Sequence, residues 1–100
     1  MMRLLLFICF TCIVSVSACQ NADPFFARRN QMVSRQIEQR GITDERILKA
    51  FRSVERHKFV PAEYTPYAYN DSPLPIAEGQ TISQPYIVAF MTDALELKKK

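Results

Sequence analysis

The chain has 100 residues, a formal net charge of +3 and 48% hydrophobic residues. This length allows one small domain with a thin core. Basic and acidic residues are interspersed along the chain, so we expect no nucleic-acid partner. The only charge run, residues 98–100, follows the last predicted helix and is interpreted as a solvated chain end.

The N-terminus has the pattern of an export signal. Arg3 precedes an uncharged apolar run, residues 4–14, that is too short for a comfortable permanent membrane span. Residues 1–18 are therefore predicted to be a signal peptide, and the protein is expected to be exported, periplasmic or membrane-anchored. Residues 16–19 resemble the lipobox of bacterial lipoproteins, in which Cys19 would carry lipid. The alternatives are an ordinary signal peptide cleaved before that cysteine and an uncleaved anchor.

If residues 1–18 are a signal peptide and Cys19 carries lipid, none of the three cysteines is available for a disulfide or a reactive thiol in the folded domain. Cys9 and Cys12 have C-x-x-C spacing but lie within the apolar run, where a redox or zinc site has no folded, solvated context. No metal site is expected, because the single histidine, His57, has no cysteine nearby. We interpret His57 as a surface or helix-end residue.

Residues 19–26 read as a polar linker that ends in an apolar pair, and the domain is expected to span 27–100. A first amphipathic helix is predicted over 27–40, with Gly41 as its left-handed C-cap. Its narrow apolar face comprises Met32, Val33 and Ile37.

A second helix is predicted after Thr43, which is interpreted as its cap, with Asp44 and Glu45 in the first turn. Its apolar positions recur at helical spacing and predict a core face. They are Ile47, Leu48, Phe51 and Val54.

The segment from Lys58 to Pro61 breaks the helical pattern, and a short third helix is predicted to begin at Pro61 and to end before Pro66. Residues 70–73 form a dense turn signal. Asp71 within this turn could act in a site, although an Asx-turn role is the commoner explanation.

A small β-hairpin is predicted, in which residues 74–76 face residues 81–82 across a turn that contains Gly79. The second arm leads into a last helix over 84–97, with Ser83 as the N-cap and Pro85 in the first turn. One face of this helix is predicted to be apolar and to need covering. It carries Ile87, Val88, Met91, Ala94 and Leu95.

Function is expected at the start of this last helix. Unpaired backbone N–H groups lie there beside the hydroxyls of Thr81 and Ser83 and the amide of Gln80, which suits an anionic or carboxylate group. Any capped helix offers a similar arrangement, so a capping role alone is the competing interpretation.

Several separate blocks of sequence now identify a family. Residues about 31–97 resemble the N-terminal region of protein-L-isoaspartate (D-aspartate) O-methyltransferases. The resemblance is carried by residues 31–33, 40–48, 54–61, 68–76 and 79–86, in that order. One small departure is Glu55, where the family commonly has proline.

The resemblance implies methyl transfer from S-adenosylmethionine to the α-carboxyl group of L-isoaspartyl and D-aspartyl residues in damaged proteins. Ser83 matches the family's active-site serine, while Gln80, Thr81, Ile82 and Val88 match positions that close over cofactor and substrate. The family is usually cytoplasmic, in tension with the signal segment, and a monomer is expected.

The predicted fold class is mainly α with a short β-hairpin, as in the N-terminal fragment of an α/β S-adenosylmethionine-dependent methyltransferase. The doubly wound sheet and the glycine-rich cofactor turn of that fold are not found here, where Gly41 and Gly79 are the only glycines. The chain is therefore expected to be truncated before the main cofactor motif and inactive by itself. The alternatives are a lipid-anchored peptide-binding module and a non-functional remnant.

Overall fold

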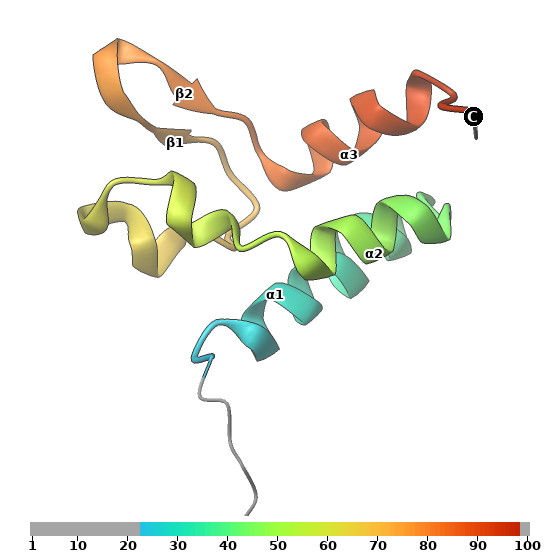
Figure 1. Ribbon diagram of the computed structural model, residues 1–100, viewed down its shortest axis with the longest axis horizontal. Coiled ribbons are helices and arrows are strands. Elements are labelled where there is room, and N and C mark those ends of the chain that lie inside the picture. Colours follow the sequence, from blue (N-terminus) through green and yellow to red (C-terminus); the bar gives the residue numbers. More distant parts are fainter. Residues whose placement is uncertain (1–22, 99–100) are drawn as a thin grey trace, which may run out of the picture.

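The computed structural model describes residues 23–98, which form short helices and one β-hairpin (Figure 1). The helices and strands are α1 (Phe26–Met32), α2 (Glu45–Ser53), β1 (Leu74–Pro75), β2 (Thr81–Ile82) and α3 (Pro85–Ala94). Shorter helical turns link them: a π-helical turn at Val33–Ile37 and 3-10 turns at Glu38–Arg40, Arg56–Phe59, Ala62–Tyr67 and Ala77–Gly79. The predicted class, mainly α with a short hairpin, is confirmed for these residues.

The predicted signal peptide (1–18), the lipobox (16–19), Cys9, Cys12 and Cys19 lie outside the described residues. The linker predicted at 19–26 is described only from Asp23 onward, and α1 begins at Phe26. No helix within residues 23–98 has the length and apolar character needed to cross a membrane.

The first helical segment is less regular than the single helix predicted over 27–40. After α1, the chain widens into the π-helical turn, where the Glu38 N–H is shared between the carbonyls of Val33 and Ser34. A 3-10 turn then ends the segment. The predicted apolar face is correct, because Met32, Val33 and Ile37 are all buried.

Gly41 ends this segment in the left-handed conformation that the sequence predicted, with φ at 99°. The Gly41 N–H donates to the Glu38 carbonyl at 3.0 Å and the Ile42 N–H donates to the Ile37 carbonyl at 3.3 Å. These two bonds define a Schellman motif. Ile37 and Ile42 are both members of the buried core cluster, which is the apolar contact that accompanies this motif.

Helix α2 is capped by Asp44 and not, as predicted, by Thr43. An Asp44 carboxylate oxygen accepts a hydrogen bond from the Arg46 N–H at 2.9 Å, and the carboxylate adds a charge-dipole term that a threonine hydroxyl lacks. Ile47 and Leu48 are buried as predicted. Phe51 is half-buried and Val54 is 52% exposed, so the predicted core face covers only the first part of the helix.

The predicted third helix is a 3-10 helix, Ala62–Tyr67, and Pro66 lies within it instead of ending it. Pro66 has no N–H to donate, and the turn continues past it, because the Ala68 N–H donates to the Thr65 carbonyl at 3.2 Å.

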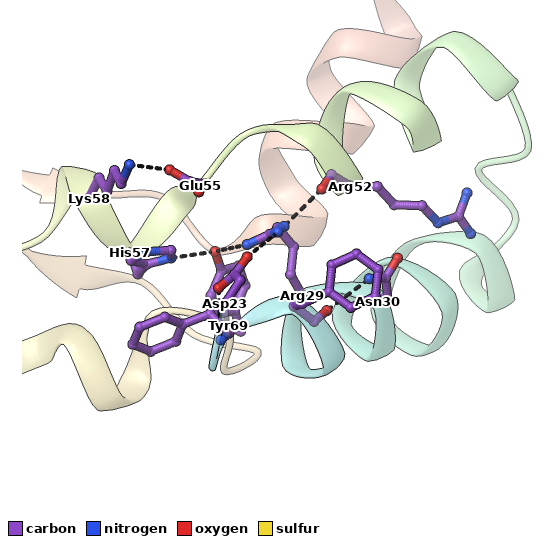
Figure 2. A network of polar contacts seen from close by, with 10 residues as sticks. Asp23, Arg29, Asn30, Arg52, Glu55, His57, Lys58 and Tyr69 are labelled. Atoms are coloured by element: carbon purple, nitrogen blue, oxygen red, sulfur yellow. Dashed lines mark hydrogen bonds and ion pairs between the residues drawn. The ribbon is translucent and has the colours of Figure 1, made fainter. Parts of the chain in front are cut away.

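His57, which was interpreted as a surface or helix-end residue, lies in the 3-10 turn after α2, is half-buried and belongs to a polar network (Figure 2). Its ring stacks on Phe25 with 4.0 Å between centroids, and Nδ1 lies 2.8 Å from the Tyr69 hydroxyl. The buried Arg29 donates to that hydroxyl at 3.2 Å and pairs with Asp23 at 2.7 Å. Arg29 also donates from Nε to the Arg52 carbonyl at 2.8 Å, so the network ties α1 to the end of α2.

The predicted hairpin is confirmed. Strands β1 and β2 are antiparallel, with Leu74 opposite Ile82 and Pro75 opposite Thr81. The turn between them places both Glu78 and Gly79 at positive φ, 61° and 69°.

Helix α3 is shorter than predicted, and the side chains that it buries lie outside the apolar face that the sequence predicted. It runs from Pro85, at the first helical position as predicted, to Ala94, and lies beside α2 (Figure 1). The side chains that it buries are Pro85 and Ala89. The residues of the apolar face that was predicted to need covering are exposed within the described structure: Ile87, Val88, Met91, Ala94 and Leu95. A small residue at Ala89 allows α3 to approach the core closely, which apolar periodicity alone does not show.

Candidate functional site

Ser83 lies between β2 and α3, where the hairpin delivers the chain to the helix. Its side chain is exposed. It does not cap α3, which corrects the sequence prediction: Gln84 is the N-cap residue, and no side-chain hydrogen bond caps the helix. The Gln84 carbonyl accepts the first helical bond, from the Val88 N–H at 3.2 Å. Ser83 is thus one residue too early to cap, and its hydroxyl is not committed to the helix end.

Arg56 holds the backbone of Ser83 from the inside of the molecule. Its Nη2 donates to the Ser83 carbonyl at 2.8 Å and its Nε donates to the Ala68 carbonyl at 2.7 Å. The residue is only 9% exposed, and this burial lowers the pKa of the Arg56 guanidinium from its usual value. One side chain therefore links the segment before the hairpin to the segment after it.

Asp71 holds the next residue, Gln84, from the outside. Gln84 Nε2 donates to Asp71 Oδ1 at 2.5 Å, and Arg40 forms an ion pair with the same carboxylate. These partners, Arg40 first, lower the pKa of Asp71 below its ordinary value. The Arg40 guanidinium also lies over the Tyr86 ring, 5.1 Å from its centroid. Asp71 therefore anchors α3, and its carboxylate does not form the Asx-turn that was the commoner expectation.

The four residues predicted to contact the cofactor do not gather at one point in the described structure. Gln80 and Thr81 are exposed on the hairpin. Ile82 and Val88 line one largely apolar pocket of about 310 Å³, which Arg56 also lines. The other lining residues are Met32, Ala50, Phe51, Val54 and Phe59. Ser83 is beside this pocket in sequence but is not among its lining residues.

Within residues 23–98, no three His, Cys, Asp or Glu side chains come together in a way that could hold a metal ion. The surroundings of Ser83 suit the positioning of a bound anionic group. An exposed hydroxyl lies just before a helix N-terminus whose backbone N–H groups favour negative charge.

Sequence reasoning singled out Ser83 and missed the side chains that fix it in place. Arg56, Arg40 and Gln84 were given no role, although they lie in the blocks that carry the family resemblance. Arg56 is 27 residues from Ser83 and Arg40 is 31 residues from Asp71, so no local pattern links them.

Comparison with known proteins gives a consistent result. The family model described as protein-L-isoaspartate(D-aspartate) O-methyltransferase matches residues 27–100. A protein-L-isoaspartate O-methyltransferase of Synechococcus sp. (strain JA-2-3B'a(2-13)) is 58% identical over 76 residues, 76% of this chain and 31% of that protein. One from Methanoculleus marisnigri is 58% identical over 77 residues, 77% of this chain and 35% of that protein.

These matches show that the chain is related to methyltransferases. More narrowly, it belongs to the protein-L-isoaspartate (D-aspartate) O-methyltransferase family. The chain spans about a third of the length of the curated relatives it matches.

Proposed function

We propose that this chain supplies the active-site serine of a protein-L-isoaspartate O-methyltransferase. The reaction is methyl transfer from S-adenosylmethionine to the α-carboxyl group of L-isoaspartyl and D-aspartyl residues in damaged proteins. The observation that carries the proposal is the position of Ser83: within a segment that matches the family over residues 27–100, its exposed hydroxyl stands at the start of α3 without serving as a cap.

The chemistry requires alignment more than activation. A carboxylate has a pKa near 4 and is already ionised at neutral pH, so its oxygen can attack without a general base. A bond forms between that oxygen and the methyl carbon while the bond between the methyl carbon and sulfur breaks, and no proton is transferred. The Ser83 hydroxyl can donate a hydrogen bond to the second carboxylate oxygen, and the N-terminus of α3 favours its negative charge. Holding the oxygen in line is a positioning effect.

S-adenosylmethionine supplies the methyl group when it is bound. Two observations support the proposal that the described residues contribute one edge of such a site. Ile82 and Val88, which flank Ser83 in the sequence, line one apolar pocket. Their side chains could contact an apolar part of S-adenosylmethionine. Gln80 and Thr81 are exposed on the adjoining hairpin and could contribute polar contacts.

The test uses a chimera in which residues 27–100 replace the matching segment of the Synechococcus relative. We expect this protein to methylate an isoaspartyl peptide. Ser83→Thr keeps a hydroxyl and is expected to retain partial activity. Ser83→Asp places a negative charge where the substrate carboxylate must lie, and is expected to lower turnover at least about tenfold.

The unmodified Synechococcus protein is the positive control, and the 100-residue chain alone gives the background. Radiolabelled methyl incorporation is the measurement, with circular dichroism to show that each variant is folded. An inactive chimera, or a Ser83→Asp variant as fast as the parent chimera, would contradict the proposed role of Ser83.

A further inference from the structure

We propose that Arg56 is a positioning residue for Ser83 in methyl transfer, an inference that rests on the proposed function. Arg56 does not need to touch substrate or cofactor for this role. It binds the carbonyl of the residue whose hydroxyl is proposed to orient the substrate, at 2.8 Å from Nη2. Because the carbonyl and the hydroxyl belong to one residue, fixing the first limits where the second can point.

The Ser83 carbonyl depends on a long-range donor. It precedes the N-cap residue, so it accepts none of the regular bonds of α3. Two residues further on is Pro85, which has no N–H to offer. A guanidinium presents several N–H donors in a fixed planar fork, so Arg56 can bind this carbonyl and the Ala68 carbonyl at once.

The environment of Arg56 is costly for a simple structural side chain. The guanidinium is buried, and within residues 23–98 both of its hydrogen bonds go to neutral carbonyls and none to a carboxylate. Burying a charge without a counter-ion opposes folding. By comparison, the buried Arg29 pairs with Asp23 at 2.7 Å. A buried cation that uses its donors on the Ser83 backbone is therefore expected to serve the placement of that residue.

The two anchors act on adjacent residues. Arg56 fixes the Ser83 carbonyl from inside, and Asp71 fixes the Gln84 side chain at the surface. With both ends of this dipeptide held, the Ser83 hydroxyl has little backbone freedom left. A displacement of about 1 Å at a reacting group can cost about 100-fold in rate, so loss of Arg56 should be visible in turnover.

The test compares Arg56→Met and Arg56→Lys in the active chimera. Methionine keeps an apolar stem but removes both hydrogen bonds, and we expect kcat to fall about 10- to 100-fold. Lysine keeps the charge but cannot reproduce the planar fork, so we expect an intermediate loss. Arg52→Met is the matched control, because the Arg52 guanidinium is at the surface, 3.6 Å from a Glu38 carboxylate oxygen. We expect that control to change kcat less than about twofold.

A double mutant separates positioning from structure. If Arg56 acts through Ser83, then Arg56→Met should lower kcat less than about threefold in a Ser83→Ala background, because the hydroxyl it places is already gone. An equal loss in both backgrounds would show that Arg56 acts independently of Ser83, through the fold or through the pocket that it lines, and would overturn the inference.

A second measurement keeps the inference testable if the parent chimera is inactive, a result that would contradict the proposed function alone. In the 100-residue chain, Arg56→Met should shift the NMR signals of the Ser83 carbonyl carbon and the Gln84 amide, whereas Arg52→Met should not. Unchanged Ser83 and Gln84 signals in Arg56→Met would overturn the positioning role independently of any activity.

Discussion

Asp71 gives the start of α3 a pH-dependent anchor. The nearby Arg40 and Gln84 lower the pKa of its carboxyl group in the folded chain. A lowered folded-state pKa means that the stabilisation is fully present above the unfolded pKa of about 3.9 and is lost as pH falls through the lower folded value. We expect the thermal midpoint to drop as the solution is acidified below about pH 4.

Asp71→Asn is the control for this pH effect, since other carboxyl groups of the chain titrate in the same range. The difference in thermal midpoint between the parent and Asp71→Asn should be largest near neutral pH and should shrink on acidification. A difference that is constant from pH 7 to about pH 3 would show that Asp71 contributes nothing through its charge.

Asp44 and Ser83 are both residue types that favour helix N-caps, but only Asp44 has that role. We expect Asp44→Ala to lower the thermal midpoint of the 100-residue chain by roughly 5 °C, from loss of a cap. Ser83→Ala should stay within about 2 °C of the parent, because no capping bond is lost. Circular dichroism melting curves decide this. Equal losses for the two variants would mean that the Ser83 hydroxyl stabilises the helix after all.

At the scale of elements, the Schellman motif at Gly41 ends the first helical segment. An alanine Cβ built at Gly41 meets no atom within 4 Å, so the cost of Gly41→Ala comes from the backbone alone. A non-glycine residue at this positive φ is strained, and we expect a loss of about 1–2 kcal/mol in the free energy of unfolding. Gly41→Asn should lose less, because asparagine tolerates the left-handed region. Urea titration of the three proteins tests this order.

Elements with a local signal were predictable from the sequence. Gly41 and Pro85 fix a helix end and a helix start through their own backbone limits, and the hairpin pairing follows from its turn. The contact of α3 with the core was not predictable, because its buried position, Ala89, is small, whereas the larger apolar residues around it are exposed. The cap of α2 was predicted one residue too early. Thr43 and Asp44 are both residue types that favour N-caps, and the sequence alone does not show at which of them the helix begins.

At the scale of the whole molecule, two buried arginines connect segments that are distant in the sequence. Arg29 bonds to groups 6, 23 and 40 residues away, and Arg56 bonds to groups 12 and 27 residues away. Such contacts join segments that lie far apart along the chain, so a single sequence without related sequences gives no sign of them. The candidate site was therefore predictable at Ser83 itself but not in the residues that hold Ser83.

The predicted export of the chain belongs to this scale too. Arg3, the apolar run and residues 16–19 predict that 1–18 are removed or inserted into the membrane, and the lipobox interpretation predicts that Cys19 carries lipid. We expect mass spectrometry of the protein expressed in a bacterium to show a lipid-modified chain beginning at Cys19. Cys19→Ser is the control and should abolish the modification. A soluble chain that begins at Met1 would contradict export, whereas a processed chain with unmodified Cys19 would contradict lipidation alone.

The π-helical turn at Val33–Ile37 has a consequence for insertions and deletions. A π-helical turn behaves as an α-helix that has accepted one extra residue while the turns on either side keep their direction. Removing one residue elsewhere in a helix rotates everything beyond it by about 100°. Removing the half-buried Ser34 would instead relax this turn to regular α-helix and leave Arg40 facing Asp71. We therefore expect the segment before Gly41 to tolerate the loss of one residue at this turn with the Arg40–Asp71 ion pair retained.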